Sequence, residues 1–242
     1  MHFIFERLFQ FLLPAQCPCC EKFLEEGQRG ICPDCLSQIH WIEPPFCSVC
    51  GTPFLSQEVK SHSCSHCLTR KKYFKMARAL GTYHGSLREA IHQWKYQGKT
   101  TWTSFFGEWM AEKIHLYWDP GLFDLLMPVP LHPQRLRHRG FNQVLLLVKE
   151  LSRRTGIPYR KKILQKRKVT IPQVNLSGKG REKEVRGSFH VAGKETLKGK
   201  SILLVDDVYT TGATVNECSK VLLAAGAERV DVFTLAHALK TI

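Results

Sequence analysis

The sequence has no long apolar run. None of its stretches reaches the roughly 18–20 apolar residues that span a bilayer, so we expect no transmembrane helix. It also lacks a convincing export signal, because Glu6 and Arg7 interrupt the apolar N-terminal stretch and Gln16 is a poor residue before a cleavage point. We therefore expect a cytoplasmic protein whose N-terminus forms a short amphipathic helix that ends at Pro14.

Acidic residues are scarce relative to basic ones. The chain has 35 Lys and Arg against 21 Asp and Glu, and residues 131–186 hold 16 of the basic and only 3 of the acidic residues. A concentrated positive field attracts polyanions such as phosphorylated ligands or nucleic acid, although a merely solvated surface is the alternative. We expect single-stranded DNA to bind the surplus charges, without strong sequence preference, at Lys161, Lys162, Lys166, Arg167 and Lys168.

Cysteine nearly disappears after residue 67. Nine of the ten cysteines lie in residues 17–67, mostly as CxxC pairs separated by 11, 11 and 13 residues. In a reducing compartment such pairs indicate metal ligands rather than disulfides. The eight candidate ligands are Cys17, Cys20, Cys32, Cys35, Cys47, Cys50, Cys64 and Cys67.

Two thiolates three residues apart can wrap one ion, and two such turns complete a tetrahedron, so the four pairs predict two structural Zn²⁺ ions. An iron–sulfur cluster or a redox sensor is the alternative. Either adjacent or alternating pairs could combine, and we favour adjacent pairs. We expect Cys19 to be a bystander and Cys218 a core thiol, while His62 or His66 could replace a cysteine ligand.

Strand and helix patterns alternate from about residue 76 onward, which divides the chain into a cysteine-rich domain (1–75) and an α/β domain (76–242). Such alternation predicts a mostly parallel sheet flanked by helices. The expected strands are 76–83, 123–129, 201–205 and 229–235, and the expected helices are 87–96, 103–117, 142–154 and 214–225.

Two carboxylates follow the buried strand 201–205, and a loop of small hydroxylated residues and glycine comes next. Gly212 lets the backbone approach a phosphate closely, and loop amides and the following helix N-terminus favour phosphate oxygens. The carboxylates suit sugar hydroxyls and Mg²⁺ instead. An ordinary strand end with a turn is the alternative. The candidate binding residues are Asp206, Asp207, Thr210, Thr211, Gly212, Ala213 and Thr214.

This stretch resembles the phosphoribosyl-pyrophosphate (PRPP) motif of type I phosphoribosyltransferases. The segments 83–96 and 127–143, preceded by the cysteine module, resemble the ComF family of competence-associated proteins. The resemblance implies a type I phosphoribosyltransferase-like domain after a double zinc ribbon, with Mg²⁺-bound PRPP as ligand. It also implies a pyrophosphate loop with Arg135, Arg137 and Arg139, and a mobile loop with Gln173 and Arg181. Glu184 departs from the family, which commonly has Asn there.

Two functions remain open from the sequence. The first is a PRPP-binding protein that handles single-stranded DNA during uptake and transformation, with competence or DNA-processing proteins such as a helicase as partners; the family resemblance favours it. The second is an active transferase that moves phosphoribose to a nucleobase or amine. Several aromatic residues could stack on bases but fit a helical core better: Trp94, Tyr96, Trp102, Phe105, Phe106 and Trp109.

Overall fold

The computed structural model describes residues 16–25, 30–54, 56, 60–119, 121–131, 136, 141–167, 185–192 and 197–239. Within these residues no helix is both long enough and apolar enough to cross a membrane. The predicted N-terminal helix lies outside the described residues.

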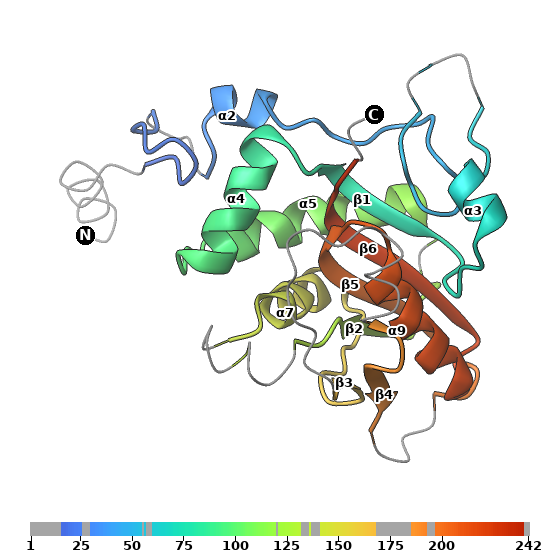
Figure 1. Cartoon of the computed structure of the whole chain (residues 1–242). Coiled ribbons are helices and arrows are strands. Elements are labelled where there is room, and N and C mark those ends of the chain that lie inside the picture. Colours follow the sequence, from blue (N-terminus) through green and yellow to red (C-terminus); the bar gives the residue numbers. More distant parts are fainter. Residues whose placement is uncertain are drawn as a thin grey trace.

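Four parallel strands form the central sheet in the order β1-β6-β5-β2. They are β1 (Ala77–Thr82), β2 (Leu125–Pro128), β5 (Ser201–Tyr209) and β6 (Arg229–His237). Each predicted strand is present, and β5 and β6 continue beyond their predicted ends. Because all strands run the same way, their carboxyl ends meet along one edge of the sheet (Figure 1).

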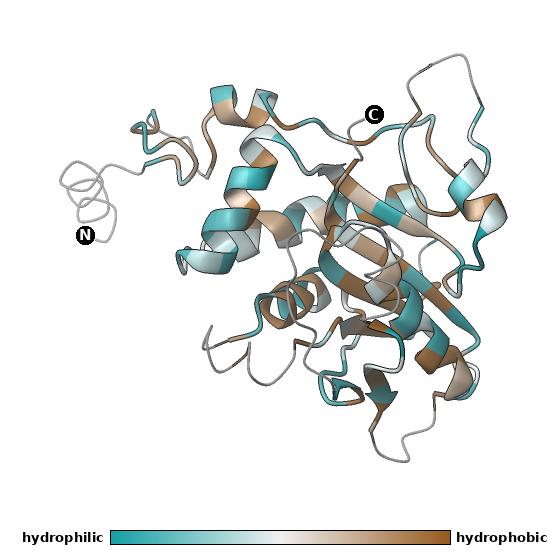
Figure 2. Ribbon diagram, in the orientation of Figure 1, coloured by the Kyte–Doolittle hydropathy of each residue, from teal (hydrophilic) through white to brown (hydrophobic). Residues whose placement is uncertain are grey.

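Helices cover both faces of this sheet. Side chains of α4 (Gly85–Tyr96), α5 (Trp102–Tyr117) and α7 (Gln143–Thr155) share a core with Leu203 and Val205 of β5. Since successive strand residues alternate faces, Ile202 and Leu204 pack on the other side, against α9 (Ala213–Ala224). Figure 2 shows apolar segments along the central strands and along α7.

The aromatic residues of α4 and α5 mainly build the core. Trp94, Trp102 and Phe106 are fully buried, and their rings contact one another within 5.5 Å between centroids. Tyr96 is exposed, whereas Phe105 and Trp109 are partly buried against the same core. The five buried or partly buried aromatic residues therefore pack in the helical core and do not form a surface on which bases could stack.

The cysteine-rich part packs along the β1 edge of the sheet. Residues 40–42 pair with β1, with the Ile42 amide donating to the Leu80 carbonyl at 2.9 Å and the Thr82 amide to the His40 carbonyl at 2.9 Å. The Ala77 amide also donates to the Val49 carbonyl at 2.7 Å. The two helices of this part are short: α2 (Pro33–Ser37) and α3 (Ser65–Thr69). The division near residue 75 stays a prediction, and the two parts are in direct contact.

A small antiparallel pair was not predicted from the sequence. β3 (Leu164–Lys166) pairs with β4 (Phe189–Val191), with Leu164 opposite Val191. These strands flank the segment expected to be a mobile loop, most of which lies outside the described residues. Their pairing joins the described residues on either side of that segment, and β4 also contacts α9.

Candidate functional site

Asp206 and Asp207 lie within β5, near its carboxyl end. Parallel pairing with β6 continues through them, with Asp206 opposite Thr234 and Val208 opposite Ala236. The strand alternation places the two carboxylates on opposite faces of the sheet edge. The Asp207 amide also donates to the Asp206 carboxylate at 2.9 Å. The sequence predicted that this strand ends at Val205, but in the structure the strand continues through both acidic residues to Tyr209.

Lys95 of α4 forms an ion pair with Asp207, with 2.8 Å between Nζ and Oδ2. Both side chains are largely shielded from solvent, at 13% and 20% exposure, which strengthens the interaction relative to a surface pair. Sequence reasoning did not assign Lys95 to the site. The segment 83–96 had a family resemblance, but nothing in it identified a partner 112 residues away.

Asp206 is difficult to ionise. Burial raises the pKa of its carboxyl to about 8, and the neighbouring Asp207 carboxylate adds to the rise. The positive charges of Lys95 and Lys166 oppose this shift and lower the pKa of Asp206. Lys166 therefore lies within electrostatic reach of the carboxylates, although sequence reasoning grouped it with the nucleic-acid residues.

The loop after β5 leads directly into α9. Gly212 is the N-cap residue and has a left-handed φ of +73°. A Cβ atom at this position would collide with the Tyr209 side chain, so glycine is required both by the backbone and by the space. The first amides of the helix have no intrahelical acceptors and can donate to an anion.

Three threonines lie in the loop and at the start of the helix. Thr210 is exposed, and Thr211 and Thr214 are half-buried. The Thr211 hydroxyl accepts a hydrogen bond from the Ala213 amide at 3.4 Å. The structure thus brings together a strand end with two carboxylates and a loop with phosphate-binding chemistry.

The eight predicted cysteine ligands form two clusters of adjacent pairs. One contains Cys17, Cys20, Cys32 and Cys35, the other Cys47, Cys50, Cys64 and Cys67, and the sulfur atoms of each lie within 4.8 Å of one another. Tetrahedral Zn–S bonds of about 2.3 Å place sulfur atoms about 3.8 Å apart. One sulfur–sulfur distance in each cluster matches this value: 3.6 Å between Cys20 and Cys32, and 3.7 Å between Cys50 and Cys64. Both clusters therefore fit structural zinc.

Backbone amides support the thiolates of these clusters. Cys47 Sγ accepts from the amides of Cys50 at 3.4 Å and Cys64 at 3.3 Å. The hydrogen bond from the Cys50 thiol and these amides lower the pKa of Cys47 to about 3. Cys19 belongs to neither cluster, and Cys218 is fully buried in the core, as predicted.

The histidine alternatives are not supported by the geometry. His62 stacks on Phe54, with 4.4 Å between ring centroids, and its Nδ1 bonds the carbonyl of Lys60. Neither His62 nor His66 joins a ligand cluster among the described residues.

A chain of side-chain contacts connects the second cluster to the loop. Cys50 Sγ lies 3.1 Å from the Thr52 hydroxyl, which lies 3.2 Å from His237 Nε2. The His237 ring packs on Tyr209 with 4.7 Å between centroids, and Tyr209 lies against Gly212. The second cysteine cluster is therefore connected to the loop through Thr52, His237 and Tyr209.

Other predicted residues are not brought into the site by the described structure. Lys161, Lys162 and Arg167 are exposed around β3. Outside the described residues lie Arg135, Arg137, Arg139, Lys168, Gln173 and Arg181. Their roles stay predictions.

Two family descriptions match parts of the chain: a double zinc ribbon domain over residues 8–68 and a phosphoribosyl transferase domain over residues 146–241. Competence protein F of Haemophilus influenzae is 31% identical over 231 residues, which cover 92% of this chain and 97% of that protein. The DNA utilization protein YhgH of Escherichia coli is 30% identical over 230 residues, which cover 94% of this chain and 99% of that protein. Competence protein ComFC of Streptococcus pneumoniae is 31% identical over 218 residues, which cover 88% of this chain and 90% of that protein. The predicted fold, a phosphoribosyltransferase-type sheet after a zinc ribbon, is confirmed by these matches and by the topology.

Proposed function

The chain belongs to the ComF family, and from this membership we propose that it binds PRPP and handles single-stranded DNA during DNA uptake. The observation that carries the PRPP proposal is the loop 210–214, which joins a strand end with two carboxylates to a helix N-terminus. The names of the relatives, two competence proteins and a DNA utilization protein, support the DNA context.

Each part of PRPP has a matching group in this site. The 5′-phosphate accepts hydrogen bonds from the loop amides and threonine hydroxyls. The ribose hydroxyls donate to Asp206 and Asp207. Asp206 and Asp207 would also help to hold a Mg²⁺ bound together with PRPP, and that ion would neutralise part of the charge of the ligand. Lys95 supplies a cation at the same edge, and Arg135, Arg137 and Arg139 are proposed for the pyrophosphate.

Calorimetry on a double variant tests this proposal. Asp206→Asn with Asp207→Asn keeps the side-chain size and removes the negative charge, so PRPP binding in the presence of Mg²⁺ should be lost. Asp124→Asn is the matched control, because Asp124 lies just before the amino end of β2, where it pairs with Lys200 at 2.8 Å. Unchanged PRPP affinity in the double variant would rule out the assigned site.

The nucleic-acid part of the proposal is carried by the charge count of residues 131–186. Replacing Lys161, Lys162, Arg167 and Lys168 with Gln should weaken oligo-thymidylate binding and make its affinity less dependent on salt. On single strands, the slope of log affinity against log salt concentration has a magnitude of about 0.7 for each phosphate contacted. Lys166 is left intact because its charge acts on Asp206. If this variant binds the oligonucleotide with the affinity and salt slope of the parent, the segment is a solvated surface and the nucleic-acid proposal is wrong.

Phosphoribosyl transfer is the second candidate function, and the match to the phosphoribosyl transferase domain favours it. In that case an amine or base displaces pyrophosphate from C1 of PRPP, and the protein supplies positioning and charge stabilisation. Product analysis after incubation with PRPP, Mg²⁺ and individual bases separates the two functions. Pyrophosphate release that depends on one base indicates an enzyme, whereas PRPP binding without turnover indicates a binding protein.

Location and partners follow from the same proposal. Two thiol clusters suited to zinc agree with a reducing compartment. We therefore propose a cytoplasmic location, with a helicase or another DNA-processing protein as a partner. Metal analysis of protein purified without added metal should return about two zinc per chain.

A further inference from the structure

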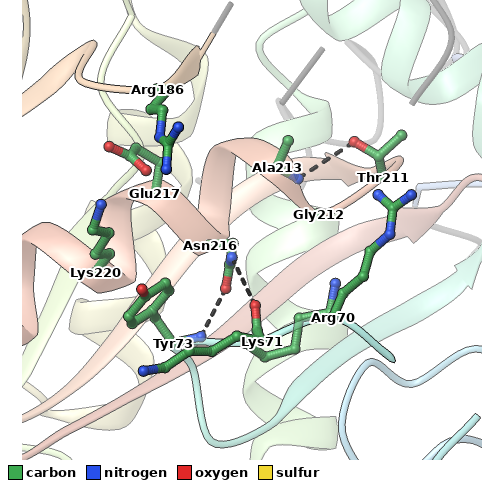
Figure 3. A pocket seen from close by; sticks show the side chains of 11 residues that line it. Arg70, Lys71, Tyr73, Arg186, Thr211, Gly212, Ala213, Asn216, Glu217 and Lys220 are labelled. Atoms are coloured by element: carbon green, nitrogen blue, oxygen red, sulfur yellow. Dashed lines mark hydrogen bonds between the residues drawn. The ribbon is translucent and has the colours of Figure 1, made fainter. Parts of the chain in front are cut away.

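A positively charged cleft lies beside the candidate PRPP loop, on the solvent-facing side of α9. Its volume is about 570 Å³. Figure 3 shows the side chains that line it. Three segments line it: residues 70–73 after the second cysteine cluster, Arg186 before β4, and the loop and α9 from Thr211 to Lys220. Asp206 and Asp207 are not part of its lining, so the cleft is separate from the proposed ribose site.

Cations dominate the lining. Its basic residues are Arg70, Lys71, Lys72, Arg186 and Lys220, and Glu217 is its one acidic residue among those described. Within the described part of the chain, none of the cations Lys71, Lys72, Arg186 and Lys220 forms an ion pair. Glu217 accepts the Gly187 amide at 2.8 Å. The cleft therefore holds an uncompensated positive charge.

The protein holds these cations in place rather than leaving them on a loose surface. Asn216 of α9 accepts the Tyr73 amide at 2.7 Å and donates to the Lys71 carbonyl at 3.2 Å, which fixes the segment 71–73 against the helix. The ammonium groups of Lys71 and Lys220 both lie over the Tyr73 ring, 5.1 Å and 5.9 Å from its centroid. Two like charges are thus directed to one place from different elements.

We propose that this cleft binds the sugar-phosphate backbone of single-stranded DNA. Figure 3 shows Arg70 beside Thr211, away from Lys71 and Lys220 at the Tyr73 ring, so cations lie at separate places along the cleft, which suits several successive phosphates better than one small anion. Lysines act as point charges and need no fixed acceptor geometry, so they suit binding without sequence preference. Basic grooves that follow the backbone are the usual binding surfaces for single strands without sequence preference. This inference rests on the nucleic-acid part of the proposed function.

Sequence reasoning did not find this surface, because two of its three segments lie outside residues 131–186. Lys71 and Lys72 lie beside the predicted domain boundary, and Lys220 lies in the predicted helix 214–225, for which no binding role was predicted. The fold brings them together with Arg186, the last residue of the basic segment. The proposed strand path therefore runs from the basic segment across the cleft next to the PRPP loop.

The test compares the parent protein with three variants by fluorescence anisotropy of labelled oligo-thymidylate across a salt series. The cleft variant carries Lys71→Gln and Lys220→Gln. Its matched control carries Lys22→Gln and Lys113→Gln, which remove the same charge outside both the cleft and the basic segment. The third variant is the four-residue change in the basic segment described above.

The cleft variant should bind several-fold more weakly, with a log–log salt slope smaller by about 1.4, because about 0.7 is lost for each of two phosphate contacts. The control should match the parent, and unchanged zinc content and melting temperature in the cleft variant would show that it is folded. If the basic-segment variant binds weakly but the cleft variant matches the parent, the cleft proposal is wrong and the proposed function stands. If the parent itself does not bind the strand, both are wrong.

Discussion

Gly212 is the residue on which the geometry of the candidate PRPP loop depends most directly. We predict that Gly212→Ala abolishes PRPP binding and destabilises the protein, because the left-handed backbone costs about 1–2 kcal/mol for a residue with a Cβ and that Cβ also collides with Tyr209. Gly156→Ala is the control, since Gly156 has a similar φ of +75° but nothing within 4 Å of a new Cβ. Calorimetry and thermal unfolding measure both effects, and equal unfolding penalties in the two variants would contradict the close contact with Tyr209.

The raised pKa of Asp206 predicts a pH dependence for PRPP binding. The carboxyl is mostly protonated below its pKa of about 8, and a bound Mg²⁺ or a sugar hydroxyl donor favours the ionised form. PRPP affinity should therefore rise by up to about tenfold per pH unit below pH 8 and level off above it. Proton release on binding, measured by calorimetry in buffers of different ionisation enthalpy near pH 7, checks the sign. Proton uptake, or the same release in Asp206→Asn, would contradict it.

The two cysteine clusters differ as structural elements. Cys47 and Cys50 share a core with Phe74 and Val232, whereas the first cluster forms a small core of its own with few neighbours. Cys50→Ala should therefore lower the melting temperature and the PRPP affinity, the latter through Thr52, His237 and Tyr209.

Cys20→Ala is the comparison for this prediction, because Cys20 is an exposed ligand of the first cluster. It should unfold that cluster locally and leave PRPP affinity close to that of the parent. Differential scanning calorimetry with zinc analysis measures both variants. Equal losses of melting temperature and PRPP affinity would show that the second cluster has no special connection to the loop.

Elements whose pattern is local could be predicted from the sequence. Apolar periodicity in residues 142–154 and 214–225 identified α7 and α9, and CxxC spacing identified both metal clusters. The end of β5 could not be predicted, because Asp206 and Asp207 look like the start of a loop and only their pairing with β6 keeps them in the strand.

Contacts between distant segments were the part that sequence reasoning missed. The ion pair of Lys95 with Asp207 and the bonds of Asn216 to the segment 71–73 depend on how helices pack on the sheet. Neither leaves a periodic or motif signal in the sequence. The change in composition near residue 75 was interpreted as a domain boundary. It gave no sign that the residues just before it line a cleft together with α9.

At the scale of the whole molecule, the two proposed ligands meet at one loop. Thr211, Gly212 and Ala213 belong to the proposed PRPP site and also line the basic cleft. Since both ligands are anionic, we predict that saturating PRPP with Mg²⁺ weakens oligo-thymidylate binding several-fold. Linkage requires that the strand weaken PRPP binding by the same factor. Fluorescence anisotropy in the presence of PRPP measures the effect on strand binding, and calorimetry in the presence of the strand measures the effect on PRPP binding. If neither ligand changes the affinity for the other, the two sites are independent.

A crystal structure of the protein with PRPP and Mg²⁺ tests the central claim most directly. The account predicts the 5′-phosphate on the backbone amides of residues 211–214, and the ribose hydroxyls on Asp206 and Asp207, with Asp207 no longer paired with Lys95 alone. PRPP bound elsewhere, or an unliganded loop in crystals grown at saturating PRPP, would contradict it.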